Sequence, residues 1–399
     1  MRGEGVSIAR EPGAGGTTAV SCRRVLGLIG GPLSGVGYVR FVQPFEQLRS
    51  RGFELATLPD SLRLTRGPGG YEPDPALLDG VSLLVFPQMV LAPVLADGSR
   101  VNVVRPLCAE ARRRGIPIVY SVDDYLPEIE EHNPEYERIR GSHDNLRAIL
   151  DEADAILATT EPLRESLAPL GKPVHLLPNA IDPARWRLRP RRADELRVGW
   201  AGSGSHLDDL RMLLPALRQL QRRVECRFVM LGLTDLPLGE QVRRIKRDRR
   251  GYTRAQRSRA ERFLEVARQL RGLRHEHVPF RPMDRYFEAL PALDLDLGVC
   301  PLLDAPFNRH KSAIKFYEYA ATGTMTVASD VPSYRDEVSV TVPDDAGAWC
   351  DALEHWLRDD RARDEELERQ RAFVLEHRNI EKLADRWAGA LESILEETK

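Results

Sequence analysis

Residues 308–323, NRHKSAIKFYEYAATG, carry charged side chains at spacings that could hold a phosphorylated ligand. Lys311 and Lys315, two of only six lysines in the chain, are one helical turn apart. If Ser312 begins a helix, a phosphate there would meet free backbone N–H groups and the Lys311 ammonium. Glu318 would then lie about 9 Å along the axis, roughly the distance from a diphosphate to its ribose. We predict that Lys311 clamps phosphate, that Lys315 shares the cationic load and that Glu318 binds ribose hydroxyls; the alternative is a weak surface pair of Lys315 with Glu318.

Two adjacent carboxylates follow an apolar run in YSVDDYLPE (120–128). Asp123 and Asp124 could bind a metal, accept a proton or hold sugar hydroxyls. The alternative is that an aspartate caps the next helix, although two adjacent side chains cannot both be caps.

Small residues follow another apolar run in GWAGSGSHLDDL (199–210). Gly202, Ser203 and Gly204 could offer backbone N–H groups to a phosphate, with Ser205 or His206 opening a helix. An ordinary capped helix is the alternative, and a lone histidine is commonly a hydrogen-bonded surface group.

The glycine-rich stretch GGPLSGVG (30–37), followed by Tyr38, also separates an apolar run from an amphipathic one. Its spacing is not GxGxxG, so a dinucleotide site is a poor match. We expect this loop to line a cleft, with a tight turn as the alternative.

A framework of parallel strands must position these loops, and the sequence has the alternation of stretches that is typical of such a framework. Apolar runs alternate with amphipathic stretches, and a turn-rich segment at 179–190 interrupts them. We predict an α/β fold of two doubly wound Rossmann-like domains, 22–180 and 190–375, facing each other across a cleft, and a helix at 376–399 that packs on either domain. The eleven predicted strands are VLGLIGG (25–31), FELATL (53–58), VSLLVF (81–86), IPIVYS (116–121), DAILATT (154–160), PVHLLP (173–178), LRVGWAG (196–202), CRFVMLG (226–232), HEHVPF (275–280), LDLGVC (295–300) and MTVASD (325–330).

Composition agrees with two globular domains. The 399 residues exceed the size of one hydrophobic core, and the net charge of −2 gives no global attraction to nucleic acid or anionic lipid. Five dispersed cysteines without a CxxC pair argue against disulfides and against a zinc site, so we expect a reduced, cytoplasmic location. Residues 1–21 lack the apolar region of a signal peptide and are expected to form a disordered tail; no apolar run could span a membrane.

One segment breaks the pattern, because residues 243–274 contain 13 basic residues against three acidic ones. We expect a solvated helical insertion that leans on a partner or an anionic ligand. A nucleic-acid patch is the alternative, although Tyr252 and Phe263 are the only aromatic residues there that could stack bases.

Five stretches together resemble, in order, blocks of bacterial GT-B nucleotide-sugar glycosyltransferases of the large retaining family. They are GPLSGVGYVRFVQPFEQL (31–48), VYSVDDYLPEI (119–129), LPNAIDPARW (177–186), VGWAGSGSHLDDL (198–210) and KSAIKFYEYAATGTMTVASD (311–330). The similarity covers about residues 25–340. One departure is that the first position of the family's E-x7-E motif falls on His310, whereas the second falls on Glu318.

The resemblance implies a nucleotide diphosphate sugar, linked to GDP or UDP, held by the second domain without an essential metal or other cofactor. Lys311 would stabilise the leaving group, with Asp123, Asp124 and His206 as catalytic candidates and Gly35, Gly37 and Tyr38 on the acceptor side. The implied donor-binding residues are Gly202, Ser203, Phe280, Asn308, Lys311, Ser312, Lys315 and Glu318.

We therefore expect a retaining glycosyltransferase that acts on a small soluble acceptor such as a secondary metabolite or a thiol or hydroxyl precursor. We expect no nucleic-acid partner and no integral membrane contact, and leave self-association into a homo-oligomer open. The alternatives are a transferase of cell-envelope polysaccharide or lipid-linked sugars, a sugar-nucleotide epimerase, and a non-catalytic module that binds sugar nucleotides or nucleic acid.

Overall fold

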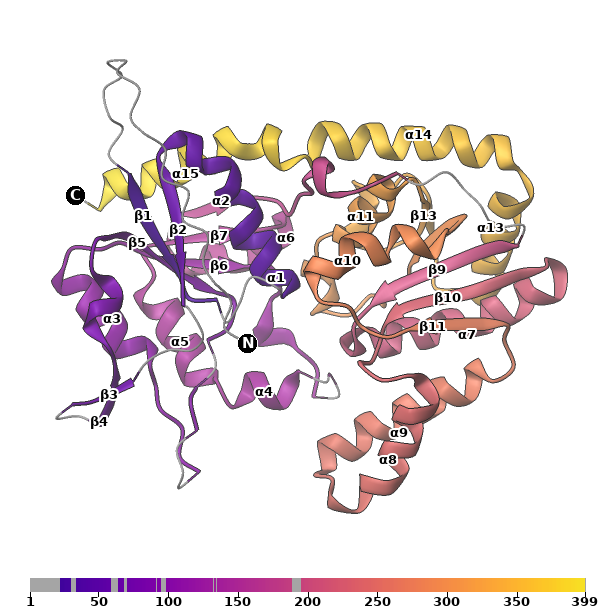
Figure 1. Cartoon of the computed structure of the whole chain (residues 1–399), viewed down its shortest axis with the longest axis horizontal. Coiled ribbons are helices and arrows are strands. Elements are labelled where there is room, and N and C mark those ends of the chain that lie inside the picture. The colour runs from indigo at the N-terminus through magenta and orange to yellow at the C-terminus, as the bar shows by residue number, and fades with distance from the viewer. Residues whose placement is uncertain are drawn as a thin grey trace, which may run out of the picture.

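Two six-stranded parallel sheets, each flanked by helices, form the framework of the chain (Figure 1). The predicted fold class is confirmed. The expected tail at 1–21 and residues 30–33 of the glycine-rich stretch lie outside the described residues. The computed structural model describes residues 22–29, 34–58, 64–67, 70–90, 92–94, 98–131, 133, 135–188 and 195–398.

The first sheet has the order β2-β1-β5-β6-β7-β8, with all neighbours parallel. Its strands are apolar runs because a sheet covered on both faces buries side chains in both directions. A separate antiparallel hairpin, β3 (Leu64–Gly67) with β4 (Gly70–Pro73), was not predicted. The remaining elements are β1 (Arg23–Gly27), α1 (Gly35–Gly37), a π-helical turn (Tyr38–Val42), α2 (Gln43–Leu48), β2 (Phe53–Thr57), β5 (Val81–Pro87), α3 (Val104–Arg113), β6 (Ile118–Val122), α4 (Tyr136–Arg140), α5 (His143–Glu152), β7 (Ala155–Ala158), α6 (Glu161–Leu167) and β8 (Val174–Leu176).

The second sheet has the order β11-β10-β9-β12-β13-β14, so the strand order reverses between β9 and β12. In such sheets ligands bind beyond the carboxyl ends of the strands at that reversal. Its elements are β9 (Leu196–Gly202), α7 (Leu207–Arg223), β10 (Cys226–Gly232), α8 (Leu238–Asp248), α9 (Arg254–Leu270), β11 (His275–Val278), α10 (Met283–Ala289), β12 (Leu297–Cys300), α11 (Ile314–Thr322), β13 (Met325–Ser329), α12 (Pro332–Arg335), β14 (Thr341–Val342) and α13 (Ala346–Arg358).

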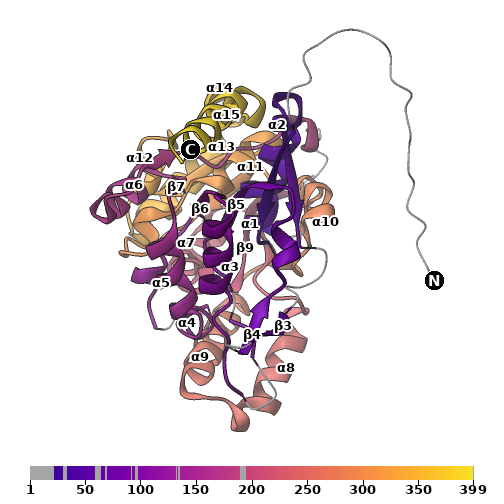
Figure 2. The ribbon, with the colours of Figure 1, turned by 90° about the vertical axis from the view of Figure 1, so that its left-hand side faces the viewer.

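The basic segment forms helices α8 and α9, a hairpin that projects beyond the second sheet at the same end of the molecule as α4 (Figures 1 and 2). The helix α9 begins with a capping box of Thr253 and Gln256, and its Phe263 and Val266 join the core around α7. The hairpin is therefore anchored on the second domain.

The chain crosses between the domains twice. It passes into the second domain after β8 and returns through α14 (Asp360–His377) and α15 (Ile380–Glu397). The two crossings touch, because Ile181 N donates to Arg378 O at 2.8 Å and Ile380 N donates to Ile181 O at 2.9 Å. The helix α15 then packs beside α2 (Figures 1 and 2), where Trp387 and Leu391 enter the first domain's core.

No helix in the described part of the chain is both long and apolar enough to cross a bilayer.

Candidate functional site

A cavity of about 240 Å³ lies between the two domains, at the carboxyl ends of the strands. It brings together eight of the residues singled out from the sequence. They are Gly35 and Asp123 from the first domain and Gly202, Ser203, His206, Phe280, Lys315 and Glu318 from the second.

Glu318 is the buried anchor of the cavity's second-domain wall, with 4% of its surface exposed. Its Oε2 accepts hydrogen bonds from the Tyr286 hydroxyl and from Lys315 Nζ, each at 2.8 Å. Lys315 Nζ also donates to the Tyr286 hydroxyl at 3.2 Å. Burial, and after it the adjacent Glu318 carboxylate, raises the pKa of Tyr286 well above its usual value, so this hydroxyl keeps its proton. Lys315 and Glu318 are thus part of a fixed network and not an exposed surface pair.

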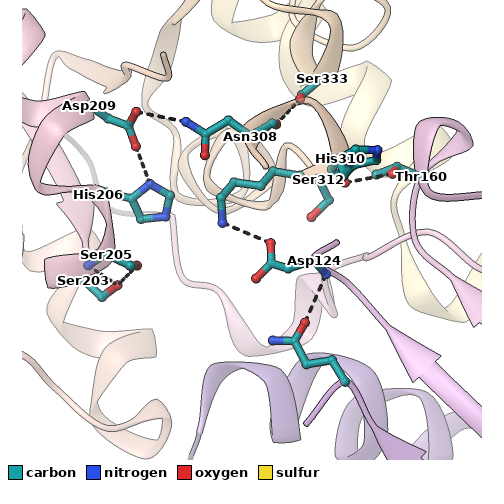
Figure 3. A network of polar contacts seen from close by, with 12 residues as sticks. Asp124, Thr160, Ser203, Ser205, His206, Asp209, Asn308, His310, Ser312 and Ser333 are labelled. Atoms are coloured by element: carbon teal, nitrogen blue, oxygen red, sulfur yellow. Dashed lines mark hydrogen bonds and ion pairs between the residues drawn. The ribbon is translucent and has the colours of Figure 1, made fainter. Parts of the chain in front are cut away.

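Lys311 reaches across the interface to the first domain. Its Nζ donates to Asp124 Oδ1 at 3.0 Å (Figure 3). The same Nζ lies 4.5 Å from the centre of the Phe307 ring. The helix α11 begins at Ile314, so the condition that Ser312 begins it is not met. The Ser312 hydroxyl accepts a bond from Asn179 Nδ2 at 2.8 Å. Lys311 therefore lies in an extended segment before α11 and is not among the residues that line the cavity.

Asp123 is partly exposed to the cavity but crowded by protein on its other sides. Burial, and after it the neighbouring Asp124 carboxylate, raises the pKa of Asp123 to about 7, against the lowering effects of Arg40 and Lys311. Arg40 is itself buried, which lowers its pKa to about 10, and its Nη1 donates to Leu177 O at 2.7 Å. A carboxyl group whose pKa lies near neutrality can accept or release a proton at physiological pH.

The backbone at the ends of β9 and β10 approaches closely beside the cavity. Leu233 N donates to Gly202 O at 2.6 Å, and Gly232 has a φ of +101° that L-residues rarely adopt. A Cβ on Gly202 would lie 2.4 Å from the Trp200 ring. Ser203 follows as the cap of a short turn, and its hydroxyl accepts from Ser205 N at 3.4 Å. The glycines thus let the loop close over the strand ends.

His206 follows in the same loop and is held by Asp209 on α7 (Figure 3). Its Nδ1 lies 2.8 Å from Asp209 Oδ2, and because a carboxylate only accepts, Nδ1 carries the proton. Asp209 Oδ1 accepts from Leu303 N at 2.8 Å and from Asn308 Nδ2 at 3.2 Å. Asp209 thereby fixes both the histidine and the loop before α11.

Several predicted residues lie outside the cavity lining. Tyr38 packs edge-on against Phe287 of α10, with ring centres 5.1 Å apart, and burial raises its pKa to about 12. Gly37 N donates to Ser34 Oγ at 3.0 Å within α1. The amide of Asn308 is engaged by Asp209, as described above.

His310, which lies at the first position of the E-x7-E motif in the resemblance described above, connects the domains. Its Nδ1 lies 2.9 Å from Pro306 O and its Nε2 lies 2.9 Å from Ser166 Oγ on α6. Its carbonyl oxygen accepts from Thr160 Oγ1 at 2.9 Å (Figure 3). His310 therefore holds the first domain against the loop before α11 and does not line the cavity.

Sequence reasoning missed four residues that build the site. Asp209 could have been found, because it follows His206 by three residues and so falls near it on the helix's first turn. Asn179 lies in a stretch that was recognised, but its bond to Ser312 spans 133 residues. Arg40 and Tyr286 carry no local signal, since only the tertiary fold brings them to Asp123 and Glu318.

Comparisons with known proteins give similarity in structure alone. No family model and no curated protein matches the sequence. One similar solved structure is a glycosyltransferase from Rickettsia africae ESF-5, with 9% identity, a TM-score of 0.59 and coverage of 94% of this chain and 98% of that one. A second is an alpha-glucosyltransferase in complex with UDP and a 13-mer DNA containing a HMU base, with 12% identity, a TM-score of 0.61 and coverage of 94% and 99%. A third is the trehalose-6-phosphate synthase OtsA, with 13% identity, a TM-score of 0.58 and coverage of 94% and 99%.

One expectation is overturned by these comparisons. The exclusion of nucleic acid as a partner was wrong as a general inference, because an alpha-glucosyltransferase of this fold is found in complex with DNA. The net charge on which we based it describes the whole chain and not one face of it. The similarity covers 94% of the chain and so both domains, and the chain has the GT-B fold of these glycosyltransferases, as its sequence blocks implied.

Proposed function

We propose that this protein is a glycosyltransferase that moves a sugar from a nucleotide diphosphate sugar to an acceptor bound in the interdomain cleft. The observation that carries the proposal is the cavity itself. It joins a buried, hydrogen-bonded Glu318 on one wall to a titratable Asp123 on the other, with the glycine-rich end of β9 between them. This arrangement suits a ligand that presents ribose hydroxyls, phosphates and a reacting sugar to different walls.

The donor's diphosphate is assigned to the space between the Gly202 loop and the two lysines. As the bond from the anomeric carbon to the phosphate oxygen breaks, negative charge develops on the leaving diphosphate. Lys315 lines the cavity, and Lys311 could exchange its Asp124 partner for a phosphate oxygen. Cations placed where charge develops stabilise the transition state. We propose UDP or GDP as the leaving group, retention at the anomeric carbon and no requirement for a metal.

The acceptor oxygen must lose a proton as it bonds to the anomeric carbon. Asp123 and His206 both line the cavity and could both receive that proton. Asp123 is the stronger candidate because its pKa, raised to about 7, lies near the working pH. We propose a small soluble acceptor, and glycans and nucleic acids are the acceptor classes to test beside it.

A thermal-shift screen against UDP, GDP, ADP and dTDP is the first test. We expect one nucleotide to stabilise the protein by about 2.7 kcal/mol at 100 times its Kd. The sugar-linked form of that nucleotide should then release free nucleotide diphosphate in the presence of acceptor mixtures. Stabilisation by none of the four would refute the proposal, and release without any acceptor dependence would contradict transfer.

A further inference from the structure

Arg40 is a buried cation next to the cavity, and the proposed function gives it no role. It lies in the π-helical turn Tyr38–Val42, of a kind that is rare and often found at functional sites, and 2% of its surface is exposed. Burying a charge is costly unless its interactions offset the loss of water. We propose that Arg40 is a positioning residue that keeps the Asp123 carboxyl ionised in the cavity, ready to take the proton of the acceptor. The inference rests on the proposed function, because it concerns the proton acceptor of that reaction.

The step that Arg40 would support is the loss of the acceptor proton. As the acceptor oxygen bonds to the anomeric carbon, its proton passes to the Asp123 carboxylate, and the bond from that carbon to the diphosphate oxygen breaks. A protonated Asp123 could not accept that proton. The ionised fraction of Asp123 therefore limits the rate at low pH.

Arg40 is bonded to residues on two sides of Asp123. Its Nε donates to Ser121 Oγ at 3.3 Å, and Ser121 lies near the end of β6, two residues before Asp123. Its Nη1 donates to Asn179 Oδ1 at 3.3 Å, and Asn179 lines the same cavity as Asp123. Arg40 itself does not line the cavity, so its guanidinium lies behind the wall that carries Asp123.

The helix α15 covers another side of the guanidinium. Arg40 Cζ lies 5.0 Å from the centre of the Trp387 ring, and Trp387 is 1% exposed. An aromatic face attracts a cation, and the buried surroundings weaken electric fields less than water does. The charge of Arg40 is therefore fixed in place and only weakly screened from Asp123.

No local carboxylate uses the charge of Arg40. Its hydrogen bonds go to the neutral oxygens of Ser121, Leu177 and Asn179. Its Nη2 and Asp123 Oδ1 are both buried, and neither atom has a hydrogen-bond partner among the described residues. The bond to Leu177 O at 2.7 Å requires a donor but not a positive charge. The fold alone thus gives no reason for a cation at this position, whereas an ionised Asp123 does.

Arg40 acts on Asp123 together with several other charged or titratable groups. Asp124 follows Asp123 in the chain, Tyr120 precedes it on β6, and Lys311 approaches from the loop before α11. Burial, and after it Asp124, raises the pKa of Asp123, and of the two cations that lower it Arg40 has the larger effect. The other such groups that line the cavity are His206, Arg281, Tyr286, Lys315 and Glu318.

Lys311 cannot serve Asp123 and the donor at the same time. Its Nζ is bonded to Asp124, and the proposed function assigns it to a phosphate oxygen of the donor. The acceptor loses its proton in that donor-bound state. Arg40 is held by its own bonds inside the first domain, so it stays in place when Lys311 turns to the phosphate. Arg40 is then the cation that offsets the burial of Asp123 at the moment of transfer.

The first test follows the Asp123 carboxyl directly, by carbon NMR of the labelled full chain over a series of pH values. Its signal is the one that Asp123→Asn removes. In Arg40→Gln, which loses the charge but can still donate to Leu177 O, we expect the titration midpoint to rise by about one pH unit or more. In Arg40→Lys, which keeps the charge, the midpoint should rise less than half as far. An unchanged midpoint in Arg40→Gln, or equal rises in the two variants, would overturn the proposal.

The second test is the pH profile of acceptor-dependent nucleotide diphosphate release. The donor is the sugar-linked form of the nucleotide that stabilises the protein most, with the acceptor mixture that supports release. A rise of one pH unit is a tenfold change in the protonation equilibrium, so the rate of Arg40→Gln should be about 10-fold lower at pH 6 and less than about 2-fold lower at pH 9. An equal loss at both pH values would show a structural role and overturn the proposal.

The matched control is Arg363→Gln. Arg363 is also a buried arginine, and its Nη1 donates to a backbone carbonyl, Trp356 O at 2.9 Å, but it lies on α14 and outside the cavity. We expect the Asp123 midpoint and the pH profile to stay as in the wild type. The same displacement in this control would overturn the proposal.

Folding of the variants is checked by urea denaturation. If Arg40→Gln does not fold, Arg40→Met, a neutral side chain of similar length, replaces it in both tests. Loss of folding in both variants would assign the charge of Arg40 to the fold and overturn the proposal.

Failure of the two proposals can be told apart. A protein that transfers a sugar, but whose Asp123 titration does not respond to Arg40→Gln, retains the proposed function and loses the role of Arg40. A protein whose Asp123 titration responds, but that binds none of the four nucleotides, keeps the coupling of Arg40 to Asp123 and loses the proposed function.

Discussion

The substitution Glu318→Gln offers the sharpest test of the donor site. It keeps the size of the side chain but removes the charge that accepts from Tyr286 and Lys315 and that we assign to the ribose hydroxyls. Hydrogen bonds to a charged group contribute about 1.5–3 kcal/mol. At about 1.4 kcal/mol per factor of ten, the Kd of UDP or GDP should rise about 10- to 150-fold. At a concentration equal to 100 times the wild-type Kd, stabilisation by the nucleotide should fall from about 2.7 to about 0.3–1.4 kcal/mol.

The assay is calorimetric titration of nucleotide into each variant, beside urea denaturation without ligand. The matched control is Glu337→Gln, because Glu337 also accepts from a buried tyrosine, Tyr317, and from a cation, Arg378 Nη2 at 2.7 Å, but does not line the cavity. We expect the control to change the nucleotide Kd less than 2-fold. A rise of less than 3-fold for Glu318→Gln, or an equal rise for the control, would refute the assignment of Glu318 to the donor.

Three further measurements test other parts of the site. Burial raises the pKa of Asp123 from 3.8 to about 7, so between these pH values the folded protein keeps a proton that the unfolded chain has lost, and the free energy of unfolding falls as the pH rises. The urea midpoint of the wild type should therefore drop between pH 4.5 and 8, and Asp123→Asn should make this drop smaller. An equal drop in the variant would contradict the raised pKa. Lys311→Gln should lower kcat for nucleotide diphosphate release by about 10²- to 10³-fold, whereas the control Lys382→Gln on α15 should leave kcat nearly unchanged. A smaller loss for Lys311→Gln would contradict the assignment of Lys311 to the leaving group. Gly202→Ala should lower the free energy of unfolding by about 1–3 kcal/mol, because the new Cβ would lie 2.4 Å from the Trp200 ring. The control Gly251→Ala should change the free energy of unfolding little, because its Cβ would meet no heavy atom within 4 Å. Equal effects of the two substitutions would refute the steric argument.

The sheets could be predicted from the sequence because buried parallel strands are continuous apolar runs. Each of the eleven predicted runs overlaps a strand of the structure. The strands β3 and β4 were missed because LTRG and GYEP have no such run, and β14 was missed because it has only two residues. Pattern recognition thus works where burial is two-sided and fails for a polar hairpin or a minimal edge strand.

The site residues could be predicted where a short stretch of sequence carries the signal. They could not be predicted where the contact joins residues that only the fold brings together. The stretches around Gly202 and Glu318 could be recognised because strand ends and helix starts leave a signature of small and charged residues. The pairing of Lys311 with Asp124 spans 187 residues, and nothing in either stretch selects the other. The helix α11 begins two residues after Ser312, and the hydrogen bond of Ser312 with Asn179 spans 133 residues, so no local pattern indicates it.

The return of α15 to the first domain sets an order of assembly. Trp387 and Leu391 lie in the same apolar cluster as Phe41, Phe45 and Leu48, which come from the beginning of the described chain. During synthesis, residues 22–180 leave the ribosome before the second domain, but their core stays open on this side until α15 has emerged, after all the strands of the second sheet. The domain that is made first is therefore completed last, and a chain truncated after α13 would contain every strand of the second sheet but leave an apolar face of the first domain uncovered.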